Sequence, residues 1–106
     1  MKVYKLDEYS QEITLLDNKD DIETYENLLQ CDAIDIATFA SAPGEYRIVA
    51  VVDDLGAYTR KATCFYASGL GLLFGSIIFA RHYYDSPDFS DIQPEDLEII
   101  KRCLIK

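Results

Sequence analysis

The sequence predicts an α+β domain: a mostly antiparallel sheet of about four to five strands with two packed helices. A run of β-branched and apolar residues over 46–52 is apolar on both faces, which is typical of a central strand covered on both sides. Two segments, 19–30 and 94–105, carry apolar residues at helical spacing. The 106 residues, 49% of them apolar, suffice for one core, so we expect a single domain over 1–106.

The first expected elements are a short strand and its continuation. Residues 2–6 form a short apolar strand interrupted by charge, and residues 11–16 either extend it or pair with it after a turn over Asp7–Ser10. Both alternatives place the two segments in the sheet.

The first helix is expected over 19–30. Asn18 is a good N-cap residue, and acids at the start suit the positive end of the helix dipole. One apolar stripe follows the helical period: Ile22, Tyr25, Leu28 and Leu29.

The remaining strands are expected near 33–39, 46–52 and 72–81. The last is interpreted as one buried strand, with Gly75 marking a bulge or a close backbone approach. Between them, Asp53–Gly56 is a turn, and Thr63–Ala67 fits either a short helix or a strand.

The second helix is expected to begin at Pro94, a favoured first helical position, with two acids after it. Its apolar face consists of Leu97, Ile100, Cys103 and Leu104. Cations at its end, Lys101, Arg102 and Lys106, suit the negative end of the dipole.

The chain is acidic, with a formal charge of −9. The negative charge lies in residues 1–42 and 82–106, on either side of a nearly neutral middle. Direct binding to nucleic acid needs clustered cations, and an anionic membrane surface would repel this chain. An acidic surface attracts basic proteins, and it also simply keeps a domain soluble. Three dispersed cysteines and a charged opening segment predict a cytoplasmic protein without zinc, disulfides, other cofactors or a membrane anchor.

A row of carboxylates is the first candidate binding site. Asp20, Glu23 and Glu26 are spaced by three on the expected first helix, on the face away from its leucines. Such a row can imitate DNA phosphates and occupy a basic cleft, whereas a solvated helix face gives the same pattern. We expect it to bind a basic host protein.

A small-ligand site is the alternative. Cations and aromatics gather in two places: Tyr58, Arg60 and Lys61, and Arg81, His82 and Tyr83. If these segments meet, Arg60 and Lys61 could hold a phosphate or carboxylate of a nucleotide or an acidic metabolite.

Catalysis and metal binding are two further alternatives. His82, the one histidine, would act as a base with Asp85 or Asp53, and Asp53 with Asp54 would hold Mg²⁺ or Ca²⁺. The glycines of 68–75 match neither a Walker loop nor a dinucleotide fingerprint. We therefore expect no catalytic residue and no metal site.

From Ile34 onward the chain resembles the bacterial and phage family called domain of unknown function 3846. The resemblance rests on a strand, the acidic turn Asp53–Gly56, the Ala62-Thr63 pair and the Gly75-led strand, with the opening segment also similar. Family members commonly carry an Asn before the Ala-Thr pair, where this chain has Thr59-Arg60-Lys61. The resemblance implies a phage or conjugative element as source and no established activity.

These observations together predict a small, acidic, non-enzymatic binding protein of a phage or mobile element, which acts on a host protein through an acidic surface. Small proteins of such elements often disable host machinery, so an anti-defence or DNA-mimic role is implied by the resemblance. The sequence leaves the oligomeric state open.

Overall fold

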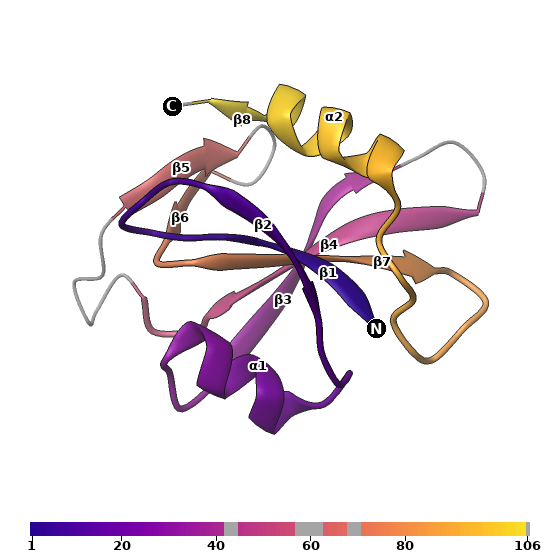
Figure 1. The fold of residues 1–106 in the computed structure, drawn as a ribbon, viewed down its shortest axis with the longest axis horizontal. Helices are drawn as coiled ribbons and strands as arrows, with labels where there is room; N and C mark the ends of the chain where they lie inside the picture. Colours follow the sequence, from indigo (N-terminus) through magenta and orange to yellow (C-terminus); the bar gives the residue numbers. More distant parts are fainter. Residues whose placement is uncertain (42–44, 57–62, 68–70, 106) are drawn as a thin grey trace.

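The structure, a computed structural model, describes residues 1–41, 45–56, 63–67 and 71–105 (Figure 1). Of residues 63–67 and 105 it describes the backbone alone. Within these ranges the elements are β1 (Lys2–Leu6), β2 (Ile13–Asp17), α1 (Ile22–Leu29), β3 (Ile34–Ser41), β4 (Tyr46–Asp53), β5 (Thr63–Ala67), β6 (Gly71–Phe74), β7 (Ile77–Tyr83), α2 (Pro94–Cys103) and β8 (Leu104–Ile105).

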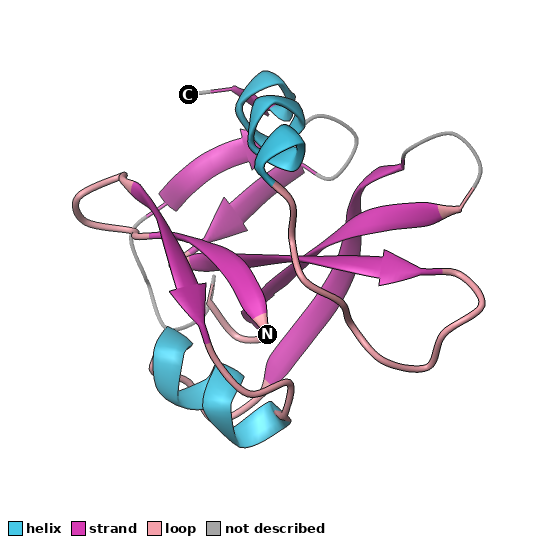
Figure 2. Cartoon of the chain, turned by 45° about the vertical axis from the view of Figure 1, so that its right-hand side comes forward, coloured by secondary structure: helices cyan, strands magenta, loops and turns pink. Residues whose placement is uncertain are grey.

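The predicted α+β fold is confirmed. An antiparallel five-stranded sheet has the order β2-β1-β7-β4-β3, and two helices pack on it (Figure 2). The strand predicted as central, β4, lies between β7 and β3. A second sheet, β6-β5-β8, was not expected from the sequence.

The five-stranded sheet has a buried core on each face. On one, the α2 face, Ile48 and Ala50 of β4 pack with Phe79 and with Ile100 of α2. On the other, the α1 face, Val49 and Val51 of β4 pack against α1. Because side chains alternate along a strand, the two-sided apolar pattern of β4 follows from these two covers. Figure 1 shows α1 and α2 on opposite sides of the sheet.

The structure shows how residues 13–17 join the sheet, and it corrects the predicted N-cap of the first helix. β2 pairs antiparallel with β1, so residues 13–17 form a separate strand. The helix begins at Ile22, and its N-cap is Asp21, whose carboxylate accepts a 2.7 Å hydrogen bond from the Thr24 amide. The predicted N-cap, Asn18, instead donates its backbone N–H to Met1 and continues the β1–β2 ladder. Ladder pairing overrides the capping preference of Asn18.

The predicted strand 72–81 is wrong as a single strand. The chain leaves β6 in the smaller sheet, turns at Gly75, and enters β7 in the larger sheet. Gly75 has φ +84, a left-handed conformation that glycine adopts without a steric penalty. An apolar run interrupted by only Gly75 and Ser76 therefore contains a change of sheet. The segment Thr63–Ala67, left open between helix and strand, is strand β5.

The second helix begins at Pro94 as predicted and ends at Cys103, two residues earlier than expected. The strand β8, Leu104–Ile105, follows directly and pairs with β5. Among the described residues no helix has the length and apolarity that a membrane crossing requires.

Candidate binding surfaces

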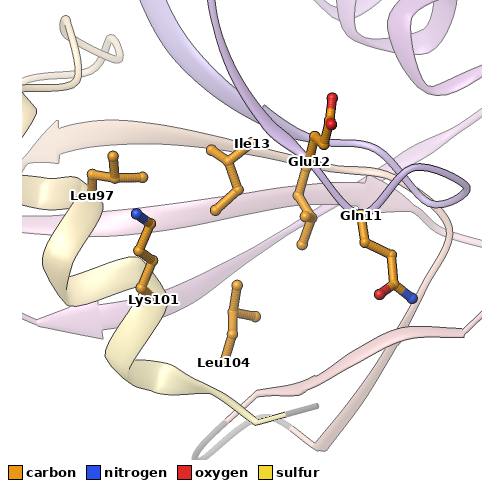
Figure 3. A pocket seen from close by; sticks show the side chains of 7 residues that line it. Gln11, Glu12, Ile13, Leu97, Lys101 and Leu104 are labelled. Carbon is orange, nitrogen blue, oxygen red and sulfur yellow. The ribbon is translucent and has the colours of Figure 1, made fainter.

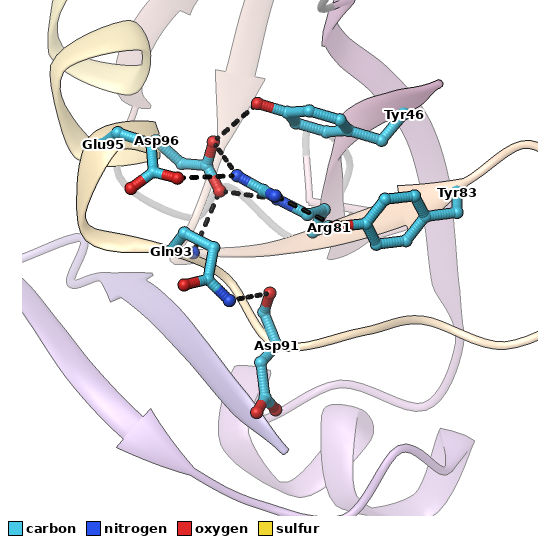
Figure 4. Close-up of polar contacts among 7 residues, drawn as sticks. All are labelled: Tyr46, Arg81, Tyr83, Asp91, Gln93, Glu95 and Asp96. Carbon is cyan, nitrogen blue, oxygen red and sulfur yellow. Dashed lines mark hydrogen bonds and ion pairs between the residues drawn. The ribbon is translucent and has the colours of Figure 1, made fainter.

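The most buried polar cluster of the described residues centres on Arg81 and Asp96 (Figure 4). The side chain of Asp96 is 0% exposed and accepts hydrogen bonds from both Nε and Nη2 of Arg81, at 3.0 and 2.9 Å. The Arg81 guanidinium lies 3.8 Å from the ring centroid of Tyr46 and donates to the Tyr83 hydroxyl at 3.1 Å. This geometry combines a bidentate ion pair with a cation–π contact.

Asp96 also stabilises the start of α2. Its Oδ2 accepts a 2.9 Å hydrogen bond from the Gln93 backbone N–H, so one carboxylate both caps the helix and pairs with Arg81 of β7. Burial lowers the pKa of Arg81, but its hydrogen bonds to Asp96 and Tyr83 outweigh this, and the pKa lies above the usual value. Arg81 therefore remains charged and holds α2 on the sheet.

Sequence reasoning did not find Asp96. Two signals were present: Arg81 follows Ile77 and Phe79 on the same face of an apolar strand, so a buried cation there needs a partner. Asp96 lies three residues after Gln93, the spacing of a capping box.

His82 lies on the opposite face of β7 from Arg81. Its Nδ1 accepts a 3.0 Å hydrogen bond from Nε of Arg47, and its Nε2 lies 2.8 Å from the Ser86 carbonyl oxygen. The Arg47 guanidinium also donates to the Thr38 hydroxyl. Both ring nitrogens are thus engaged in contacts that order the sheet and the following loop.

The two catalytic pairings considered for His82 do not form. Arg47 pairs with His82 and Asp53 lies six residues along β4, so His82 and Asp53 are roughly 20 Å apart along the strand. The ring nitrogens that Asp85 would have to contact are taken by Arg47 and Ser86.

The predicted small-ligand cluster is not assembled by the residues that the structure describes. Arg81 and Tyr83 point to the α2 face and His82 to the α1 face, because side chains alternate along β7. Arg81 is 7% exposed and fully engaged with Asp96. The other half of the cluster lies outside the described residues: Tyr58, Arg60 and Lys61.

The predicted row of carboxylates is only partly a helical row. Asp20 precedes the N-cap of α1, and its carboxylate accepts hydrogen bonds from the Tyr25 hydroxyl at 2.7 Å and from the Phe89 amide at 3.1 Å. Burial and the bond to Asp20 raise the pKa of the Tyr25 hydroxyl. Glu23 is exposed on the first turn of α1, and Glu26 is half-buried one turn later. Asp20 therefore joins α1 to the loop after β7.

Two neighbouring hollows meet at Asp20 and Phe89. One, of about 670 Å³, lies beside the loop before α2, and its lining includes Asp88 and Asp91. The other, of about 160 Å³, lies between α1 and edge strand β3, and its lining includes Asp21. The linings contain four aspartates and neither lysine nor arginine, and the Met1 amine, which lines the larger hollow, pairs with Asp17.

Apolar side chains accompany these carboxylates. Ile22 of α1 is 63% exposed and Ile36 of β3 is 44% exposed, and both line the smaller hollow with Pro87. The predicted apolar stripe of α1 is therefore wrong at Ile22, which faces solvent. We call the surface formed by Asp20, Asp21, Ile22, Ile36, Pro87, Asp88, Phe89 and Asp91 the acidic surface.

A groove of about 490 Å³ lies on the other side of the sheet, between the β1–β2 hairpin and α2 (Figure 3). Its apolar lining includes Leu6, Ile13, Leu97 and Leu104. Figure 3 shows the Lys101 amine beside Leu97 on the α2 wall of the groove and the Glu12 carboxylate directed away from the groove.

Metal ligands do not gather among the described residues: no group of three or more His, Cys, Asp or Glu side chains there could hold an ion. The acidic turn considered for Mg²⁺ or Ca²⁺ is organised by the chain itself, since the Asp53 carboxylate accepts the Leu55 amide at 2.9 Å. Asp54 is exposed, and its amide donates to the Ala33 carbonyl oxygen.

Comparison with known proteins yields no match to a family model, to a curated protein or to a solved structure. The resemblance to the domain of unknown function 3846 family therefore stays a prediction, and function must be argued from the surfaces themselves.

Proposed function

We propose that this chain is a non-enzymatic binding protein that engages a basic protein partner through the acidic surface. The observation that carries this proposal is the pair of hollows sharing Asp20 and Phe89, lined by four aspartates and neither lysine nor arginine. A cytoplasmic host protein, met by a phage or mobile-element product, is the partner class that the family resemblance implies.

The acidic surface combines two requirements of a protein interface. Exposed apolar groups at Ile22, Ile36 and Pro87 supply area whose burial favours binding. The aspartates around them select a cationic partner and raise the association rate. The net charge of −9 extends the same attraction over the whole molecule.

The local structure holds this surface in place before binding. Asp20 ties the Tyr25 hydroxyl and the Phe89 amide together, so α1 and the loop after β7 are fixed relative to each other. Phe89 packs against the rings of Tyr25 and His82, with centroids 6.4 and 5.8 Å away. A preformed surface loses less entropy when it binds.

The test is capture of partners from a bacterial lysate on the immobilised protein, followed by titration of the purified partner against this chain. We expect a basic protein, with a Kd that weakens about tenfold between roughly 0.05 and 0.5 M NaCl because salt screens exposed charges. The triple variant Asp21→Asn/Asp88→Asn/Asp91→Asn removes three exposed charges of the acidic surface and should weaken binding by a similar factor. Asn retains the capping ability of Asp21.

The matched control removes the same number of exposed charges elsewhere, in the variant Asp32→Asn/Asp54→Asn/Glu98→Gln. It should leave the association rate much closer to that of the wild type. Equal loss in both triple variants would show that net charge alone governs binding. Affinity that is insensitive to salt and to the first triple variant would refute the proposed surface.

A further inference from the structure

The two edges of the five-stranded sheet are β2 and β3, and the orientation of their backbone groups follows from the register. On β2, the Asn18 amide bonds the Met1 carbonyl and the Asp7 amide bonds the Glu12 carbonyl. Hydrogen-bonded pairs alternate along an antiparallel ladder, so residues 12, 14, 16 and 18 bond to β1. The N–H and C=O groups of Ile13, Leu15 and Asp17 point away from the sheet.

The edge formed by β3 is protected. Its Ile36 amide points outward, but it donates at 2.9 Å to the carboxylate of the preceding Asp35. The register of β3 also shifts between Thr38 and Ala40, which marks a bulge. A charge and a bulge are both devices that discourage an added strand.

Among the described residues, the edge formed by β2 has no bulge, and its one charged residue, Asp17, stands at its end and pairs with the Met1 amine. Its register with β1 runs without a shift over all five pairs, and Leu15 at its centre is 51% exposed. Ile13 and Leu15 pair with Leu6 and Tyr4, which belong to the core of the α2 face. The side chains of β2 at these positions therefore share the face on which the groove beside α2 runs.

We propose that β2 accepts an extended peptide segment of a partner protein as a sixth strand, whose alternate apolar side chains occupy the groove and whose carboxylate meets Lys101. Strand addition of this kind obtains affinity from backbone hydrogen bonds and specificity from pockets for alternate side chains. The groove supplies the apolar lining through Leu6, Ile13, Leu97 and Leu104.

Charge selects the occupant. Among the described residues no ion pair involves Lys101, and its side chain lines the groove beside Leu97 (Figure 3). An acidic side chain or a terminal carboxylate of the peptide complements it. A second copy of this chain is a poorer occupant, because two molecules of charge −9 repel each other. This site lies on the α2 face and is independent of the acidic surface.

The first experiment measures amide hydrogen exchange by NMR. In the free protein, Thr14 and Leu16 amides should be protected and Ile13 and Leu15 amides should exchange rapidly. A random seven-residue peptide library displayed on phage is then selected against the full chain. We expect enriched peptides to alternate apolar residues and to carry one acidic group, and the best of them to protect the Ile13 and Leu15 amides.

Two variants assign the effect. Leu15→Pro removes the outward N–H but leaves the ladder to β1 intact, a position at which proline is tolerated. Its matched control, Leu15→Thr, loses the same side chain but keeps the N–H. We expect Leu15→Pro to weaken peptide binding at least about tenfold relative to Leu15→Thr, and Lys101→Glu to weaken acidic peptides selectively.

Three outcomes would overturn the proposal. The first is a selection that enriches no peptide over the Leu15→Pro protein used as target. The second is peptide binding that leaves the exchange of Ile13 and Leu15 unchanged. The third is protection of these amides that rises with protein concentration without peptide, which would assign the edge to a second copy.

Discussion

The two faces of the five-stranded sheet treat the same kinds of charged residue differently. On the α2 face, Arg81 is 7% exposed and bonds to Asp96, a carboxylate at the start of α2 that is 0% exposed. On the α1 face, Arg47 is half-buried and bonds to the His82 ring and the Thr38 hydroxyl, and Asp21 caps α1 in an exposed position.

The difference lies in what covers the charged residues on each face of the sheet. The α2 face is closed over Arg81 by α2 and by the ring of Tyr46, so its charge must be compensated within the protein (Figure 4). The α1 face stays open near Asp20 and Asp21, which are both exposed and line a hollow there. A buried charge is thereby committed to the fold, whereas an exposed one is available for binding.

The strongest way to break this comparison is Asp96→Ala. Leaving Arg81 buried without its partner should lower the free energy of unfolding by about 3–5 kcal/mol, measured by urea denaturation. Glu95→Ala is the matched control, because Glu95 is 68% exposed and only 3.6 Å from Arg81, and it should cost less than about 1 kcal/mol. The double variant Arg81→Met/Asp96→Leu should recover most of the loss. Equal costs for the two single variants would contradict the distinction drawn here.

A smaller effect is expected on the α1 face. Arg47→Ala removes hydrogen bonds to His82 and Thr38 at a half-buried position, and it should cost about 1–2 kcal/mol in the same measurement. The reference is Arg102→Ala in the exposed last turn of α2, expected within about 0.5 kcal/mol of wild type. A loss as large as that of Asp96→Ala would show that the α1 face depends on its arginine as strongly as the α2 face does.

The smallest effect concerns the exposed helix cap. Hydrogen bonds from the Thr24 hydroxyl and amide lower the pKa of Asp21 below its usual value of 3.8. A carboxyl with a lowered folded-state pKa contributes stability above its unfolded pKa, and this contribution is lost as pH falls through the folded pKa. Stability measured from pH 5 down to about pH 2 should fall less steeply in Asp21→Asn than in wild type. Parallel curves would contradict this assignment.

The sequence predicted the elements better than their assembly. The position of β4 followed from its two-sided apolar pattern, and Pro94 marked the start of α2. The strand over 72–81 was wrong because apolar periodicity does not reveal a positive φ at Gly75, which sends the chain from one sheet to the other. The N-cap of α1 was misplaced because Asn18 is held by a long-range ladder bond.

The candidate sites show the same limit. Glu23 was correctly placed on an exposed turn of α1, but the position of Asp20 depends on Tyr25 and on Phe89, a contact across 69 residues. The separation of Arg81 from His82 required only strand alternation, yet it could be used only once 81–83 was known to be strand.

By itself the sequence determined the acidic charge, the α+β class and the apolar strands and helices, because composition and periodicity are local properties. The tertiary structure alone decided which charges are buried and which edge of the sheet is open. The pairing of Arg81 with Asp96 and the outward amides of β2 depend on how separate segments meet in space. Desolvation of a charge and the register of a strand depend on the packing of separate segments, so no single segment encodes them.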